Sequence, residues 1–260
     1  MTTTTSQPDT APFARRLAPM APLMIVACLC SAMTSVVEGQ QHHDPAAHGG
    51  HQQHQMHQAH EGHRNPDGYQ HDFVNPSRWS DRFDAPERDA WQKPQHLVEL
   101  MQIEAGMTVA DIGAGTGYFV EHLAAAVGEF GTVHALDIQP GMVAFIAGRA
   151  HQAPWPQVDA RQIAADDPLL EAASVDRIVI INTWHHIGAR PAYAAKLLEA
   201  LKPGGTLNVV DFTLDSPEGP PKQHRLPAPQ IVEELEAGGF DAEILAEDLP
   251  RQFVVVGRKP

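Results

Sequence analysis

The sequence predicts an α/β domain with a mostly parallel sheet covered by helices on both faces. From residue 73 onward, short apolar runs alternate with segments of helical periodicity, a pattern typical of strands joined by crossover helices. Residues 178–181 are all branched aliphatics, as expected for a strand buried on both sides. A glycine-rich loop follows another apolar run, where a strand would turn sharply into a helix.

The individual elements follow from the same alternation. The expected strands are residues 109–112, 133–138, 161–163, 177–182, 206–212, 242–246 and 253–256. The expected helices are residues 118–127, 141–151, 191–201 and 231–237, with an earlier helix introduced by residues 88–94 and running to residue 101. The Lys-Pro-Gly-Gly sequence at 202–205 and the glycine pair at 238–239 end the helices before them, because glycine and proline interrupt helical hydrogen bonding.

The charge balance and the cysteines exclude several kinds of protein. The 260 residues contain 18 lysines and arginines against 32 aspartates and glutamates, a formal net charge of −14. No nucleic-acid partner is expected, because phosphate binding needs clustered basic side chains, and a small-molecule ligand is the first expectation. Cys28 and Cys30 lie in one apolar segment, so the rest of the chain forms neither a disulfide nor a thiolate zinc site.

Residues 1–39 are predicted to be a signal peptide, a lipoprotein leader or a membrane anchor. Arg15 and Arg16 precede an uncharged stretch, residues 17–37, which is the layout of a secretory signal. Cleavage near residues 30–32, lipidation at Cys28 and an uncleaved anchor all fit, and a short buried helix or an overextended reading frame is the alternative. We expect an exported or membrane-attached protein of a bacterial periplasm or envelope, with a cytoplasmic location as the alternative.

Residues 40–72 are predicted to be a disordered linker rich in histidine and glutamine. They hold too few aliphatic residues to offset the entropy of ordering. Histidines recur at every third position, at His48, His51, His54, His57, His60 and His63. A polyproline II helix has three residues per turn and would align these imidazoles on one side. Weak zinc, copper or nickel binding is therefore one prediction, and a low-complexity spacer is the alternative.

The candidate ligand site begins at residues 111–117, which read DIGAGTG. Glycines allow a sharp turn and a close approach of ligand to backbone. The loop is not the G-x-G-x-x-G of a dinucleotide site, because residue 118 is tyrosine, and it lacks the Lys-Ser/Thr ending of a phosphate-binding P-loop. Asp137 ends the second expected strand, where a carboxylate can accept both hydroxyls of an adenosine ribose.

With these residues in place, the sequence resembles the class I S-adenosylmethionine-dependent methyltransferases of small-molecule type, and it is similar to the ubiquinone/menaquinone C-methyltransferase group. The likeness covers about residues 91–259 and includes the Lys-Pro-Gly-Gly stop before the fifth strand. It implies a Rossmann-like, seven-stranded sheet ordered 3-2-1-4-5-7-6 with an antiparallel last strand. It also implies S-adenosyl-L-methionine as the cofactor and a small-molecule methyl acceptor.

The resemblance assigns cofactor contacts residue by residue. The matching positions are Asp111, Gly113, Gly115 and Gly117 around the methionine part, then Asp137, Ile138, Asp166 and Asn182. Asp137 would hold the ribose, Ile138 would lie against adenine, and Asp166 would meet the adenine amino group. Asp167 and Pro168 follow directly, so a turn or helix-cap role is the alternative for Asp166.

The loop after the fourth strand, residues 182–187 with the sequence NTWHHI, holds the candidate catalytic residues. In this topology it lies at the carboxyl edge of the sheet, beside the methyl group. His185 or His186 could take a proton from a phenol or an activated carbon acid, or one of them bridges backbone groups as a structural residue. The loop is not Asn-Pro-Pro-Tyr, so the resemblance argues against transfer to an exocyclic or amide nitrogen.

Two further segments have open alternatives. Trp91 and Lys93 precede the sheet and either face the substrate or, in the case of Trp91, anchor the packing. Residues 215–229 are rich in proline and are either a substrate lid or a stiff surface loop.

The predicted function is methyl transfer to a small molecule by in-line displacement, in which positioning supplies much of the acceleration. The alternatives are a cofactor-binding protein without turnover, and an exported histidine-rich metal-binding protein that carries a methyltransferase-like domain.

Overall fold

The computed structural model describes residue 73 and residues 75–260. The predicted leader at 1–39 and the histidine-rich segment at 40–72, with its proposed metal ligands, lie outside the described residues. In the described part, no helix combines the length and the apolar character needed to cross a bilayer.

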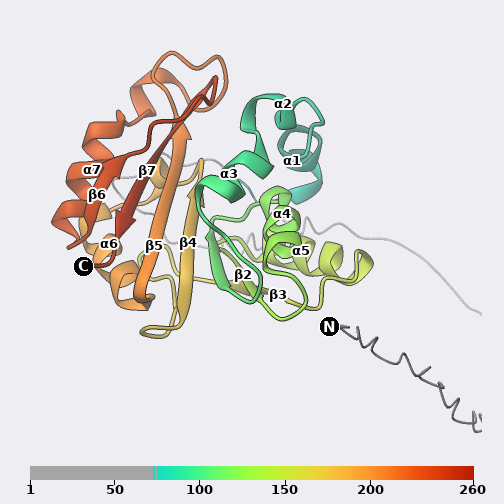
Figure 1. The fold of residues 1–260 in the computed structure, drawn as a ribbon. Coiled ribbons are helices and arrows are strands. Elements are labelled where there is room, and N and C mark those ends of the chain that lie inside the picture. The colour runs from blue at the N-terminus through green and yellow to red at the C-terminus, as the bar shows by residue number, and fades with distance from the viewer. Residues whose placement is uncertain (1–72, 74) are drawn as a thin grey trace, which may run out of the picture. The chain divides into compact units, whose positions relative to one another are not determined.

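A seven-stranded sheet forms the centre of the domain, in the order β3-β2-β1-β4-β5-β7-β6 (Figure 1). The strands are β1 (Thr108–Ile112), β2 (Thr132–Asp137), β3 (Val158–Gln162), β4 (Val175–Ile181), β5 (Leu201–Phe212), β6 (Asp241–Ile244) and β7 (Gln252–Arg258). Neighbours from β3 to β5 pair in parallel, whereas β7 is antiparallel to both β5 and β6. The predicted fold class, strand order and antiparallel last strand are confirmed.

Helices cover both faces of this sheet. The helices are α1 (Pro76–Phe83), α2 (Arg88–Gln92), α3 (Pro94–Leu100), α4 (Tyr118–Val127), α5 (Pro140–Gln152), α6 (Arg190–Ala200) and α7 (Ala228–Ala237). Side chains alternate between faces along a strand, so Ile178 and Ile180 pack in the cluster that includes α6 and α7, whereas Val179 and Ile181 pack in the cluster that includes α3, α4 and α5. This double burial explains why β4 is apolar throughout.

The edge strand β3 is displaced from its prediction. It spans Val158–Gln162 rather than 161–163, so Ile163, the apolar residue of the predicted strand, comes just after it. The strand β3 is a partly exposed edge strand, so its sequence carries little apolar signal. The strand β5 also begins earlier than predicted, at Leu201, because the chain pairs with Val175 before the Lys-Pro-Gly-Gly irregularity.

The predicted helix that residues 88–94 introduce is present as α3 (Pro94–Leu100), and the short helix α2 (Arg88–Gln92) precedes it as a separate element. Lys93 has φ 47°, in the left-handed region, and Pro94 starts a new helix, α3. A proline at the first helical position has no N–H to lose. The left-handed Lys93 thereby separates α2 from α3.

Helix α1 was not predicted, and it lies over the glycine loop. The Asp84 carboxylate after α1 accepts a hydrogen bond from the Thr116 hydroxyl (2.8 Å) and pairs with Arg149 (3.1 Å). Arg149 also donates to the Thr116 carbonyl (2.8 Å). Figure 1 shows α1 and α2 together beside the sheet. These contacts fasten an N-terminal helix to the loop between β1 and α4.

Replacing Gly113 by alanine should destabilise the protein by roughly 2 kcal/mol or more. Gly113 has φ +75°, and an added Cβ would lie 2.3 Å from the Thr183 side chain. Gly106→Ala is the matched control, because Gly106 has φ +85° with nothing within 4 Å of the added Cβ, so it carries the backbone strain alone, about 1 kcal/mol. Denaturant unfolding of both variants measures the difference. Equal losses would mean that contact with Thr183 does not constrain the loop.

Candidate active site

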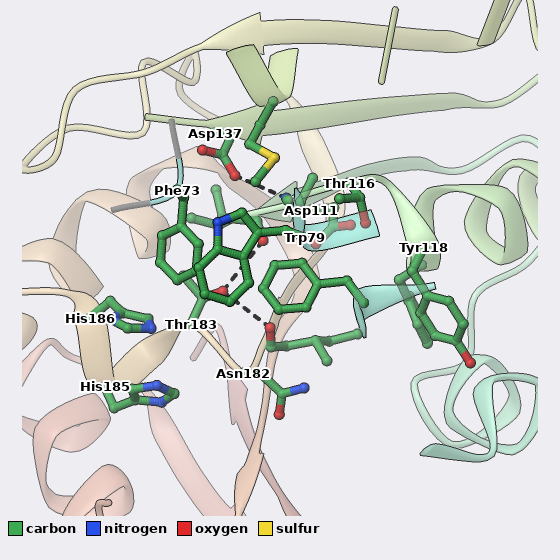
Figure 2. A pocket seen from close by; sticks show the side chains of 18 of the residues that line it. Phe73, Trp79, Asp111, Thr116, Tyr118, Asp137, Asn182, Thr183, His185 and His186 are labelled. Carbon is green, nitrogen blue, oxygen red and sulfur yellow. Dashed lines mark hydrogen bonds between the residues drawn. The ribbon is translucent and has the colours of Figure 1, made fainter. Parts of the chain in front are cut away.

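A cavity of about 640 Å³ opens at the carboxyl ends of β1, β2, β4 and β5. Its walls include the glycine loop, the tips of these strands, the loop after β4 and aromatic side chains of the N-terminal segment (Figure 2). In an open α/β sheet, ligands bind at this edge, where the strand order reverses. In this domain β2 lies on one side of β1 and β4 lies on the other side. The cavity is therefore at the switch point.

Asp137, at the tip of β2, is joined directly to the glycine loop. One carboxylate oxygen accepts the backbone N–H of Gly115 (2.9 Å), and the other accepts that of Gln139 (2.8 Å). Burial raises the pKa of Asp137, and the backbone hydrogen bonds oppose that rise. Each carboxylate oxygen has two lone pairs, so both can still accept a ligand hydroxyl. The predicted closeness of Asp137 and Gly115 is therefore present.

Asp111, at the end of β1, lines the cavity with a buried carboxylate that could pair with a cationic group of a ligand. It is 2% exposed, and its Oδ2 is buried without a hydrogen-bond partner among the described residues. Burial raises the pKa of Asp111 to about 7, the Asp137 carboxylate adds to the rise, and Arg88 opposes it. A buried acceptor without a donor is costly, and a ligand ammonium group would satisfy this oxygen.

The glycines of the loop have separate roles. Gly113 and Gly115 line the cavity, and Phe83 of α1 lies in van der Waals contact with the position of a Cβ on Gly115 (3.8 Å). Gly117 is not among the lining residues. It caps α4 with φ 82°, and a Cβ there would press on Ile146 at 3.1 Å, so its visible role is to let helix α4 pack close to α5.

Of the two residues predicted to contact adenine, Ile138 lines the cavity and Asp166 does not. Ile138 is 45% exposed, although it lines the cavity, which leaves an apolar surface for a flat ring. Ala164 and Ala165 line the cavity nearby, whereas Asp166 is exposed and is not among the lining residues. The turn between Ala164 and Asp167 directs Asp166 elsewhere, so its adenine contact stays a prediction without geometric support.

His185 and Asp211 form a buried pair at the opposite side of the cavity. His185 lies in the single helical turn after β4 (Trp184–His186), and its Nδ1 is 2.9 Å from the carboxylate of Asp211 in β5. Both residues are buried. A carboxylate at Nδ1 fixes that nitrogen as the donor and leaves Nε2 as the acceptor. No hydrogen bond from a described residue reaches Nε2, and His185 lines the cavity.

The second histidine has a different setting. His186 is half-buried, and its ring packs edge-on against Phe73 with centroids 5.7 Å apart. Phe73 also contacts Trp79, which stacks on Phe83 at 5.2 Å. These aromatic rings form an apolar wall on the cavity, and Figure 2 shows Phe73 and Trp79 between Asp137 and the two histidines. The structure thus gives His185 a carboxylate partner, Asp211, at its ring nitrogen.

The two open segments are partly placed. Trp91 lines the cavity and packs against Phe212 at 5.9 Å, so it anchors packing, and its contact with a substrate stays a prediction. Lys93 pairs with Asp248 (3.0 Å) and is not among the lining residues. In the 215–229 segment, residues 218–221 line the cavity, and the Arg225 guanidinium binds carbonyl oxygens along the same segment. The segment is therefore both a wall of the cavity and internally braced.

Several site residues were missed by sequence reasoning. They are Phe73, Trp79 and Phe83 around α1, Arg88 and Gln92 in α2, Asp211 in β5 and Gln252 in β7. The aromatic pair spaced four residues apart in α1 was the only usable sequence signal. The others depend on contacts between distant segments.

The site is suited to a nucleoside ligand, because a glycine loop after the first strand, an acid bound to it from the second strand and a cavity at the switch point come together. Residues 110–207 match the family model described as a methyltransferase domain. A crystal structure of a SAM-dependent methyltransferase from Aquifex aeolicus superposes with a TM-score of 0.68 and 24% identity, covering 72% of this chain and 99% of that one.

Curated sequences agree with the family model. A probable S-adenosylmethionine-dependent methyltransferase from Mycolicibacterium smegmatis is 30% identical over 166 residues, 60% of this chain and 62% of that protein. The ubiquinone/menaquinone biosynthesis C-methyltransferase UbiE from Saccharophagus degradans is 29% identical over 125 residues, 46% of this chain and 48% of that protein. The chain thus spans about half to three fifths of these relatives. The resemblance to S-adenosylmethionine-dependent methyltransferases is confirmed, and residues 110–207 match a methyltransferase domain.

Replacing Asp111 by asparagine should stabilise the ligand-free protein at pH 8 and not at pH 4. The pKa of Asp111 is about 7 in the folded state against an ordinary 3.8. Between these values the folded state holds a proton that the unfolded state has lost, so the free energy of unfolding of the native protein falls as pH rises. Asp111→Asn removes this fall, on the order of a few kcal/mol. Denaturant unfolding across this pH range measures it.

The exposed Asp81→Asn variant controls for the loss of one negative charge. The assignment would be wrong if both variants showed the same dependence of stability on pH as the native protein.

Proposed function

We propose that this protein binds S-adenosyl-L-methionine and transfers its methyl group to a small-molecule acceptor. The observation that carries the proposal is the union of two features at one cavity: the Asp137 carboxylate bonded to the Gly115 backbone, and the His185–Asp211 pair facing it. The similarity to UbiE supports a small-molecule acceptor. A role limited to cofactor binding is not favoured, because the described residues include an oriented candidate base.

The first half of the cavity suits the cofactor. Asp137 would hold the ribose hydroxyls, Ile138 would cover one side of adenine, and the buried Oδ2 of Asp111 would accept the ammonium group of the methionine part. Two neighbouring buried carboxylates repel each other, and a cationic ligand relieves that repulsion. When bound, the cofactor supplies an electrophilic methyl group on a sulfonium.

The second half suits the acceptor. His185 Nε2 can take a proton from the reacting group, and Asp211 stabilises the imidazolium that results. The aromatic wall of Phe73, Trp79 and Trp91 would exclude water and contact an apolar acceptor body. Residues 218–221 close the same side.

Cofactor binding is tested by heat denaturation with S-adenosylmethionine or S-adenosylhomocysteine. At a hundred times the dissociation constant, the ligand should stabilise the folded state by about 2.7 kcal/mol. Asp137→Asn should weaken binding by roughly tenfold or more, because an amide has one acceptor oxygen for two backbone N–H groups and repels one of them. Isothermal titration of both proteins gives the affinities.

Asp159→Asn is the matched control, since Asp159 lies in the edge strand β3 and not on the cavity. The proposal fails if neither ligand stabilises the native protein at millimolar concentration.

Catalysis is tested with methyl-labelled cofactor and cell extract, from which the labelled product identifies the acceptor. With that acceptor, His185→Gln should lower kcat by roughly a hundredfold, as expected for loss of a general base. Asp211→Asn should lower kcat by roughly tenfold or more, because the His185 ring would no longer be held in the required tautomer and orientation. His186→Gln is the matched control. A larger loss in the His186 variant than in the His185 variant would contradict the assignment of the base.

A further inference from the structure

A chain of side-chain hydrogen bonds connects the N-terminal helix α2 to the loop after β4. Arg88 Nε donates to Gln92 Oε1 (3.1 Å), Gln92 Nε2 donates to Gln252 Oε1 (2.6 Å), and Gln252 Nε2 donates to Asn182 Oδ1 (2.6 Å). Gln92 and Gln252 are 0% and 1% exposed. Three segments that are distant in sequence thus meet through buried amides.

Arg88 fixes the donor-to-acceptor direction along this series of hydrogen bonds. A guanidinium group has donors only, so the atom of Gln92 that faces Arg88 must be its oxygen. The other end of the Gln92 amide is then a donor, and the same reasoning passes through Gln252. Asn182 must therefore accept with Oδ1, and its Nδ2 keeps both hydrogens for another partner.

The free end of the chain faces the cavity. Asn182 lines the cavity, and no acceptor for its Nδ2 is found in residues 73 and 75–260. Its φ of 57° lies in the left-handed region, which asparagine tolerates better than most residues. Asn182 is half-buried, and the end of its amide that the relay leaves free is a donor, which suits a polar oxygen of a ligand.

The Asn182 side chain lies in the acceptor half of the cavity, which differs from the cofactor contact that the family resemblance implied for it. Gln252 belongs to β7, which pairs with β5, and Asp211 of the same β5 holds His185. Asp137 and the glycine loop belong to β2 and β1, on the other side of β4. Figure 2 shows Asn182 and His185 together on the side of the cavity away from Asp137.

We propose that Gln92 and Gln252 are positioning residues that hold Asn182 as a hydrogen-bond donor to an oxygen of the methyl acceptor. This inference rests on the proposed function. The methyl acceptor is then a phenol or an enolisable carbonyl compound with an apolar body.

His185 Nε2 takes the proton from the hydroxyl group or from the carbon beside the carbonyl, and the negative charge left on oxygen is stabilised by Asn182 Nδ2. The methyl group then bonds to that oxygen or carbon, and the sulfonium becomes a neutral thioether.

The experiment measures binding of 4-nitrophenol and of nitrobenzene to the full-length chain saturated with S-adenosylhomocysteine. Equilibrium dialysis at pH 8, where 4-nitrophenol is largely ionised, gives both dissociation constants. The two probes share the nitro-substituted ring and differ only in the phenolic oxygen. The native protein should prefer 4-nitrophenol by about tenfold or more, the effect expected of a hydrogen bond to a charged group.

Asn182→Asp is the decisive variant. It keeps the oxygen that accepts from Gln252 and the left-handed backbone, and it replaces the donor Nδ2 with a carboxylate oxygen. The preference for 4-nitrophenol should disappear, whereas the affinity for S-adenosylhomocysteine should stay within about twofold. Gln252→Met breaks the relay without touching the cavity and should reduce the preference severalfold. Gln157→Met is the matched control, because the Gln157 amide binds the Ala124 carbonyl away from the cavity.

Each other outcome has a definite meaning. A preference that survives in Asn182→Asp would overturn the inference, as would a native protein that binds S-adenosylhomocysteine but shows no preference. An equal loss of S-adenosylhomocysteine affinity in Asn182→Asp would assign Asn182 to the cofactor instead and also overturn it. Absence of S-adenosylhomocysteine binding by the native protein would overturn the proposed function itself, and that result is read before any probe is added.

Discussion

The hydrogen bond between the Asp137 carboxylate and the Gly115 backbone N–H is the contact on which the site depends. It joins the end of β2 to the loop that follows β1, so two adjacent parallel strands present one continuous surface. The same carboxylate fixes the start of α5 through Gln139. The loop is further tied to α1 and α5 through Thr116 and its partners Asp84 and Arg149. A loop of small residues, which would otherwise be free to move, is thereby held in one shape before any ligand arrives.

The strand order divides the chemistry of the cavity. Acidic groups gather at β1 and β2, where burial raises the pKa of both Asp111 and Asp137 and the Asp137 carboxylate adds to the rise at Asp111. On the far side of β4, the polar groups are a histidine oriented by Asp211 and an amide oriented by Gln252. One half is therefore suited to a ligand with positive charge and hydroxyl groups, and the other to a group that loses a proton. The switch point brings the two halves together because neighbouring strands end at the same edge.

Much of the fold and of the cofactor half was predictable from residue types. Alternating apolar and helical patterns predicted the strands β1, β2, β4 and β7 to within a few residues, and the glycine spacing predicted the loop with Gly113 and Gly115 directly after Asp111 in β1. The edge strand β3 was displaced because a half-exposed strand has a weak apolar pattern. The separate helix α2 was not predicted, although Pro94 is a signal for a break, because the residue before a proline is disfavoured in a helix. Asp166 fitted a family position, yet its backbone turn directs it to solvent.

The sequence by itself determined the order of strands and helices, the bend at the glycine loop and the acid that ends β2, since these depend on local periodicity and on conformations that nearby residues allow. Only the tertiary structure decided which histidine has a carboxylate at its ring, which aromatic side chains line the cavity, and how Arg88, Gln92 and Gln252 orient Asn182. Those features need contacts between segments up to 160 residues apart, and donor and acceptor geometry across such distances is set by packing, not by neighbours along the chain.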